Sequence, residues 1–334
     1  MMSSKSMMAE LVWAPPGALS RLRPGACQLL TALNERVWQA GDPVLLELVR
    51  VRVAQLIGNP AAARVRCGYA AAAAGPELEA KVAALPGYPG SPLFSTAERD
   101  VVEFTEQFVI DVGGTPEDVR AVLTGRYGTD GARALVTAIY VVEFTQRLQL
   151  IAARLLGDAA PPAAGSFAPV DASVDASPAG LLDAYQAAVV RGSALDPVTT
   201  ELVRLRCART HHCRICQTLR LADARAAGVD ETMTAKVDRY ERSDLPERAK
   251  VALRVTDAFI TRPDLLSEAA AGQARASFGP AELASLCLDI TKWSTQKIKV
   301  ALGTDGADRL VTDADGVALF GFDSGGRVTG YRRR

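Results

Sequence analysis

Apolar residues recur at helical spacing through most of the chain and predict a protein built mainly of α-helices. The two longest apolar runs, at 130–157 and 280–303, each repeat an apolar residue every three to four positions and end at a glycine, as helices often do. Two shorter amphipathic segments, at 95–109 and 245–259, follow capping or turn residues. Alanine is abundant and aromatic residues are few, which also favours helices.

Two segments depart from this helical pattern. Residues 158–177 are rich in proline, alanine, serine and aspartate and are predicted to form a linker. Near the end of the chain, apolar segments at 317–322 and 327–331 flank a glycine-containing turn. The sequence therefore predicts a β-hairpin within a C-terminal tail at 306–334, most simply covering an edge of the helical body.

The chain contains the same helical pattern twice. The 25 residues beginning at Asp42 align with those beginning at Asp196 at a constant offset of 154, and ten of them are identical. In both copies an Asp-Pro pair supplies a helix N-cap and the first helical residue. We therefore expect an all-α tandem duplication, with one domain at 1–157 and a second at 178–305.

Composition narrows the class of protein. A length of 334 residues suits about two domains. Lysine plus arginine equals aspartate plus glutamate, at 38 each, which argues against a nucleic-acid partner. No apolar run approaches the ~20 residues of a membrane span, and the first residues lack the apolar core of a signal peptide. The sequence thus predicts a cytoplasmic protein without a membrane partner, whose six thinly spread cysteines are mostly reduced.

Ionisable groups gather in one short stretch of the second copy. Cys213 and Cys216 form a CxxC, the only two histidines, His211 and His212, directly precede it, and Glu201 lies twelve residues before Cys213. In a reducing compartment a CxxC indicates thiol redox chemistry or metal binding. Adjacent His-His-Cys residues are too cramped for four ligands to reach one ion, so no metal is expected.

This arrangement resembles the alkylhydroperoxidase D and carboxymuconolactone decarboxylase superfamily. The likeness lies in the glutamate, the CxxC at a helix start and the repeat of about 130 residues, and it covers 26–157 and 178–305. A further helix carries matching residues at Glu247, Arg248, Leu253, Ala258 and Phe259. The first copy has Asn59 and Ala62 at the two cysteine positions, so we interpret it as a degenerate domain without redox chemistry.

The resemblance implies a thiol-dependent peroxidase that reduces hydroperoxides. It implies that Cys216 attacks the peroxide, although helix position alone favours Cys213 as the more acidic thiol. A Cys213–Cys216 disulfide then forms and is reset by a dithiol protein of the lipoyl or thioredoxin type. The resemblance requires no organic cofactor, and it implies a homo-oligomer, with a trimer of fused pairs expected; the alternative is a monomer whose halves bury the same faces.

The chain departs from the peroxidase pattern at the histidine that relays protons to the second cysteine, because Arg220 occupies that position. Three roles therefore stay open. Glu201 could act as a general base, or form a buried salt bridge with Arg220, since the first copy keeps both at Glu47 and Arg66. His212 could replace the relay histidine or complement a helix dipole, and Arg220 could stabilise a thiolate.

Other readings of the sequence remain open. Lys292 and Trp293 on the last long helix could line a pocket, although a tryptophan there more often belongs to a core or an interface. The alternative functions are a cofactor-free lyase of the carboxymuconolactone decarboxylase type and a non-enzymatic redox sensor or scaffold that switches through its CxxC.

Overall fold

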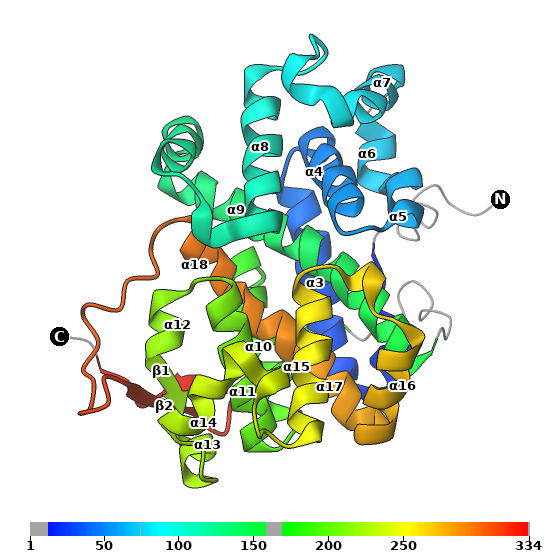
Figure 1. Ribbon diagram of the computed structural model, residues 1–334. Coiled ribbons are helices and arrows are strands. Elements are labelled where there is room, and N and C mark those ends of the chain that lie inside the picture. The colour runs from blue at the N-terminus through cyan, green and yellow to red at the C-terminus, as the bar shows by residue number, and fades with distance from the viewer. Residues whose placement is uncertain (1–12, 74, 158–168, 333–334) are drawn as a thin grey trace.

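The computed structural model describes residues 13–73, 75–157 and 169–332, and these residues are mostly helical, as expected (Figure 1). The elements of the N-terminal half, with η marking 3₁₀ turns, are α2 (Gly17–Leu22), α3 (Pro24–Ala40), α4 (Pro43–Leu56), α5 (Pro60–Arg64), α6 (Gly68–Ala73), α7 (Pro76–Ala84), η1 (Leu85–Gly90), α8 (Thr96–Asp111), η2 (Val112–Gly114) and α9 (Glu117–Leu156). Those of the C-terminal half are α10 (Pro178–Arg191), α11 (Pro197–Thr210), α12 (Arg214–Thr218), β1 (Leu219–Leu221), α13 (Ala222–Ala226), α14 (Glu231–Ala235), η3 (Lys236–Arg242), α15 (Glu247–Ile260), η4 (Pro263–Leu265), α16 (Glu268–Ser277), α17 (Pro280–Trp293), η5 (Ser294–Gln296), α18 (Lys297–Ala301), β2 (Ala318–Phe322) and β3 (Val328–Thr329).

The two predicted Asp-Pro helix starts are confirmed. The Asp42 side chain accepts hydrogen bonds from the backbone N–H groups of Val44 and Leu45 at the start of α4. Asp196 accepts from the N–H of Thr199 at the start of α11. In each helix proline follows the cap, where its missing N–H removes no helical hydrogen bond. The matching sequences therefore form matching helices in the two halves.

The two long helices differ from their prediction in detail. Both end at a glycine with positive φ, Gly157 at 86° and Gly303 at 66°, as expected. α9 begins well before the predicted run and is broken at Gly128, whose φ of 69° only glycine adopts readily. The run predicted at 280–303 is divided into α17, the 3₁₀ turn η5 and α18. Part of the predicted linker, 158–168, lies outside the described residues.

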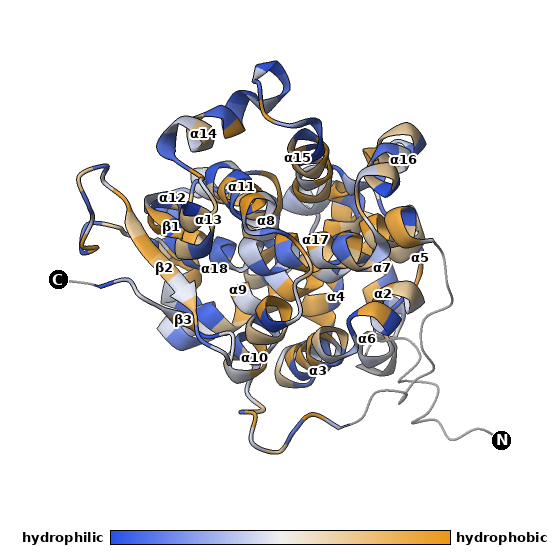
Figure 2. Cartoon of the chain, turned by 90° about the horizontal axis from the view of Figure 1, so that it is seen from below, coloured by the Kyte–Doolittle hydropathy of each residue, from blue (hydrophilic) through white to orange (hydrophobic). Residues whose placement is uncertain are grey.

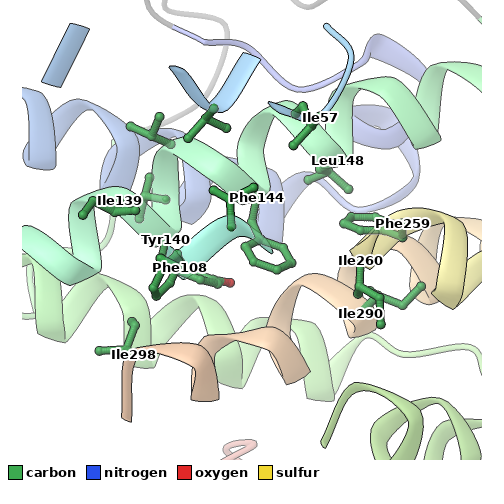
Figure 3. Packing of buried hydrophobic residues seen from close by; sticks show 14 of the residues in the cluster. Ile57, Phe108, Ile139, Tyr140, Phe144, Leu148, Phe259, Ile260, Ile290 and Ile298 are labelled. Carbon is green, nitrogen blue, oxygen red and sulfur yellow. The ribbon is translucent and has the colours of Figure 1, made fainter. Parts of the chain in front are cut away.

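Residues of both halves form one buried cluster. Phe144 of the N-terminal half lies beside Phe259 of the C-terminal half, with 6.3 Å between their ring centres, and Phe108, Tyr140 and Ile290 belong to the same cluster (Figure 3). All five are almost completely buried, and burial of each apolar side chain stabilises the fold by about 1.5–3 kcal/mol. α3 also packs against α10, and α9 against α17. The two copies thus cover each other's apolar faces, while the domain boundaries given above stay a prediction.

Helix α9 is long and apolar enough to cross a membrane by length and composition alone. However, 78% of its most apolar window is buried inside the protein, and it runs through the centre of the molecule (Figure 1). This burial is typical of a core helix.

The C-terminal tail forms the predicted hairpin and also joins a strand that was not predicted. β2 pairs antiparallel with β3, and on its other edge it pairs parallel with β1, with Leu219 opposite Ala318 and Leu221 opposite Phe320. Figure 2 shows β2 as an apolar strand beside β1 and α13. Since β1 directly follows the CxxC helix α12, the tail lies over the thiol-bearing segment of its own chain.

A buried cluster of charges joins the two halves. The carboxylate of Glu143 on α9 accepts two hydrogen bonds from Nζ of Lys297 on α18, at 2.9 and 2.8 Å, and one from Nε of Arg147 at 2.8 Å. Arg147 also donates to the carbonyls of Phe259 and Thr261. Burial lowers the pKa of Lys297 to about 8, and Glu143 opposes that shift. The carboxylate therefore holds two buried cations from opposite halves.

We predict that Glu143→Gln destabilises the protein by about 3–5 kcal/mol, because it leaves two buried cations without their carboxylate. Urea unfolding measures this loss. Arg126→Ala is the control on the same helix. It breaks a surface pair with Asp100 in which the arginine side chain is 36% exposed, and it is expected to cost at most about 1 kcal/mol. Equal effects of the two substitutions would contradict a structural role for the buried cluster.

Candidate functional site

The CxxC stands at the junction of two helices. α11 ends at Thr210, and His212 adopts a left-handed conformation with φ of 54° that turns the chain. Cys213 then caps α12, its Sγ accepting from the backbone N–H of Cys216 at 3.3 Å. The two sulfurs form a disulfide of 2.04 Å. The predicted thiol pair is thus in contact and oxidised.

One of the two cysteines faces a cavity. A cavity of about 970 Å³ lies between α10, α12, α17 and the C-terminal hairpin, and we call it the redox cavity. Cys216 lines it and is 8% exposed, whereas Cys213 is 0% exposed and is not among its lining residues. Phe320, Phe322 and Tyr331 of the tail form part of its wall. A small molecule in this cavity therefore meets Cys216 before Cys213.

Glu201 is engaged in a buried salt bridge, but its partner is Arg204 and not Arg220. Nε and Nη2 of Arg204 donate to the two carboxylate oxygens of Glu201 at 2.6 and 2.7 Å. The remaining donors of Arg204 bind the backbone carbonyls of Cys216 at 2.7 Å and Leu219 at 2.5 Å. The alternative of a Glu201–Arg220 salt bridge is wrong, because Arg204, three residues along the same helix, is the immediate neighbour of Glu201 and binds both of its oxygens.

The first copy reproduces this arrangement without thiols. Arg50 binds both oxygens of Glu47 through Nε and Nη2, and it donates to the carbonyls of Ala62 and Val65. These positions correspond at the offset of 154 to those of the second copy. The Glu–Arg pair therefore holds the following segment in place whether or not that segment carries cysteines.

Arg220 belongs to a separate salt bridge. Its Nε and Nη2 bind Glu231 at 3.0 and 2.7 Å, and Nη1 binds the carbonyls of Gln217 and Leu219. Arg66 makes the same set of contacts in the first copy, with Glu79 as its acid. A guanidinium neutralised in this way adds little positive charge to a nearby thiolate.

Neither histidine is brought to the redox cavity. His211 is buried, and its Nε2 lies 3.1 Å from Oγ of Ser294. Burial lowers the pKa of His211 well below its usual range, and the positive charges of Lys297 and Arg147 lower it further. His212 is exposed, and a Cβ on Gly113 would lie 2.4 Å from its Nδ1, so its ring rests against the first copy. No contact in the described part of the chain links His212 to Cys216.

Lys292 is the ionisable group that the structure adds to the site. It is 4% exposed and lines the redox cavity together with Trp293, which favours the pocket interpretation of these two residues. Its Nζ lies 3.0 Å from the centre of a Trp293 ring and 4.7 Å from that of Phe322. Among the described residues, no hydrogen bond or ion pair engages this Nζ.

The surroundings of Lys292 favour the neutral amine. Burial lowers its pKa well below the usual range; Asp289 opposes this shift, and the charge of Arg204 adds to it. Burial also raises the pKa of Asp289 to about 6. The sequence allowed Lys292 and Trp293 to line a pocket but favoured a core or an interface, and it indicated no role for the amine, because a lysine on an apolar helix usually extends its amine to solvent. No group of three or more histidine, cysteine or acidic residues within the described ranges could hold a metal.

Comparison with known proteins assigns the second copy to a family. The model of the carboxymuconolactone decarboxylase family matches residues 179–239, which include the CxxC. Two Mycobacterium tuberculosis proteins, the uncharacterized protein MT2376 of strain CDC 1551 / Oshkosh and the uncharacterized protein Rv2313c of strain ATCC 25618 / H37Rv, are each 36% identical over 240 residues. The match covers 68% of this chain and 82% of each relative. The chain belongs to the carboxymuconolactone decarboxylase family. No solved structure matches it.

The family match ends before α15, so it covers only part of the second copy. The likeness of the first copy to the family rests on the internal repeat and on the matching Glu–Arg contacts.

We predict that Arg220→Ala and Arg66→Ala both destabilise the fold and leave the thiol pKa values unchanged. Each substitution removes the partner of two backbone carbonyls and of one carboxylate, at a cost of about 1–3 kcal/mol. Arg66→Ala is expected to cost less, because its partner Glu79 is 60% exposed and that of Arg220 is 33% exposed. Urea unfolding and the pH dependence of thiol alkylation measure the two effects. A raised Cys216 pKa with unchanged stability would show that Arg220 serves the thiol.

Proposed function

We propose that the protein is a thiol-dependent peroxidase that reduces hydroperoxides through a Cys213–Cys216 cycle. The observation that supports it most is the CxxC disulfide, one cysteine of which faces a cavity that also holds a buried, unpaired lysine. Once the disulfide is reduced, the cavity offers both a nucleophilic sulfur, that of Cys216, and an amine that can carry a proton, that of Lys292. Its walls are partly aromatic, which suits an organic hydroperoxide.

The proposed cycle has three steps. The Cys216 thiolate attacks the distal peroxide oxygen, the O–O bond breaks, and the leaving alkoxide takes a proton to become an alcohol. The thiol of Cys213 then attacks the sulfur of the Cys216 sulfenic acid, so that the disulfide forms and water leaves. An external dithiol reduces this disulfide and is itself oxidised. The reductant is a protein of the lipoyl or thioredoxin type, and a homotrimer stays our expectation for the assembly.

Lys292 replaces the missing histidine as the proton carrier in this proposal. A neutral amine accepts the proton of the Cys216 thiol and returns it to the alkoxide in the next step. Glu201 does not serve this purpose because both of its oxygens bind Arg204. Glu201 instead acts through Arg204 as a positioning residue for the Cys216 backbone.

A cofactor-free lyase is the second candidate function. Lys292 supplies an ionisable group inside an apolar cavity, which the CxxC motif itself does not contain. An activity of this type would persist when both cysteines are replaced by serine. Turnover that requires Cys216 and an external dithiol separates the peroxidase from this lyase and from a redox sensor.

We predict that one equivalent of cumene hydroperoxide added to the reduced protein forms the Cys213–Cys216 disulfide. In Cys213→Ser the Cys216 sulfenic acid accumulates and reacts with dimedone, while Cys216→Ser gives no product at either position. Mass mapping measures these species. Cys207 is the internal control, since burial raises its pKa to about 12 and it stays reduced. A sulfenic acid on Cys213 in the Cys216→Ser protein would reverse the assigned roles.

We predict that Lys292→Met lowers the peroxidase rate by about 10²-fold or more and removes the rise in rate with pH that accompanies deprotonation of the Lys292 amine. Lys236→Met, which breaks a surface pair with Asp244, is the control. Stopped-flow peroxide consumption from pH 5 to 10 measures both. An unchanged rate in Lys292→Met would exclude the amine as the proton carrier.

The same variant has a second readout in stability. In the unfolded chain Lys292 is protonated below a pKa of ~10.4. Below that pH, folding of the wild type must either release this proton or bury the charge. Wild-type stability therefore rises with pH up to that value. Lys292→Met lacks this dependence. Its stability advantage over the wild type should therefore be largest at low pH and shrink as the pH rises. Denaturant unfolding at several pH values measures the difference.

A further inference from the structure

The first copy contains a second cavity, of about 1240 Å³, which we call the first-copy cavity. It lies between α3, α4 and α9 of the first copy and α16 and α17 of the second. Arg50, Asn59 and Ala62 line it at positions that correspond to Arg204, Cys213 and Cys216. It is therefore the counterpart of the redox cavity, with no sulfur at the CxxC positions.

Unpaired polar atoms concentrate around this cavity. Among the described residues, six buried side-chain nitrogen or oxygen atoms lack a hydrogen-bond partner, and three of them belong to its lining: Nε1 of Trp13, Nδ2 of Asn34 and Oε1 of Gln146. Asn34 is 1% exposed and Gln146 is 5% exposed. Because an unpaired polar atom inside a protein is destabilising, three of them around one cavity indicate a binding role.

Neighbouring hydrogen bonds determine whether each of these atoms can donate or accept a hydrogen bond from a ligand. Nε2 of Gln146 donates to the carbonyls of Arg50 and Val142, at 3.2 and 3.3 Å, so its Oε1 is held as an acceptor. The indole N–H of Trp13 can only donate, and the Asn34 amide presents a second donor. The site therefore offers two donors and one acceptor. A hydroxyl group has the complementary set, since it donates once and accepts twice.

The rest of the lining selects a flat and uncharged molecule. Trp38, which stacks against Tyr69, joins apolar side chains such as Leu150 and Leu283 in the wall. The two arginines nearest the CxxC-equivalent positions, Arg50 and Arg66, are neutralised by Glu47 and Glu79. At the rim, Arg154 and Arg275 share the carboxylate of Glu268.

We propose that the first-copy cavity binds a small aromatic hydroxy compound. Its hydroxyl accepts from Trp13 and Asn34 and donates to Gln146, and its ring lies among the apolar residues of the wall. Phenols are neutral at pH 7, so binding buries no charge. The first copy then acts as a ligand-binding domain, which is a function independent of the peroxidase cycle.

Isothermal titration calorimetry on the full-length, oxidised protein tests this proposal with three probes of similar size. p-Cresol carries the complementary hydroxyl, toluene lacks it, and benzoate accepts but cannot donate. We expect p-cresol to bind with one site per chain and at least about tenfold more tightly than either of the others. Equal affinity for p-cresol and toluene, or no binding of p-cresol, would overturn the proposal, and neither result depends on a variant.

Two variants locate the site. Gln146→Leu removes the acceptor while keeping the volume of the side chain, and we expect p-cresol affinity to fall by about tenfold or more. Gln55→Leu is the matched control, since Gln55 is an exposed residue of α4 that does not line the cavity, and it should leave the affinity unchanged. Unchanged p-cresol affinity in a folded Gln146→Leu protein would place binding elsewhere and reject the assignment.

Discussion

Each copy of the repeat depends on one arginine that is held by a buried carboxylate and in turn holds a loop. Glu201 and Arg204 lie three residues apart on α11, and the guanidinium reaches the carbonyls of residues 216 and 219. The carboxylate is what permits an arginine to be buried, since an isolated buried cation would be strongly destabilising. The segment that follows is thereby fixed relative to α11, and with it the position of Cys216. In the first copy Arg50 is bound by Glu47 and holds the carbonyl of Ala62 in the same way. The Glu–Arg arrangement therefore does not require the cysteines.

Changes at a few equivalent positions give the two cavities different chemistry on this common framework. Aligned from their terminal glycines, α9 and α17–α18 place Glu143 opposite Asp289 and Gln146 opposite Lys292. The second copy thus combines a disulfide with an unpaired amine, and the first combines an alanine with an unpaired amide oxygen. Glu143 has Lys297 of the other half as a partner, whereas Asp289 accepts a side-chain hydrogen bond, among the described residues, only from the hydroxyl of Ser193. One acid therefore joins the two halves, and the other lies near the redox cavity.

Much of the fold could be predicted because its signals are local. The Asp-Pro caps, the terminal glycines, the hairpin and the repeat were all visible in short stretches of sequence. Long-range geometry was not. β1 is only three residues long and becomes a strand by pairing with residues about a hundred positions later, so no alternation could reveal it. The pairing of Glu201 with Arg220 seemed supported by the repeat, yet the nearer Arg204 is also repeated. The left-handed turn at His212 sends its ring toward Gly113, which spacing along the chain could not show.

The position of Cys216 constrains how the proposed cycle can be reset. A hydroperoxide is small enough to enter a cavity of about 970 Å³, but a cysteine residue that is only 8% exposed cannot meet a thiol fixed on the surface of a globular protein. Either the C-terminal hairpin moves aside, or the reductant extends a slender arm into the cavity. The hairpin is held by hydrogen bonds to β1 and by the ring contacts of Phe320 and Phe322 with Trp293. These contacts would have to break before a bulky partner could enter. For the proposed cycle we therefore propose a lipoyl-type arm, in preference to a thioredoxin-type surface, as the source of electrons.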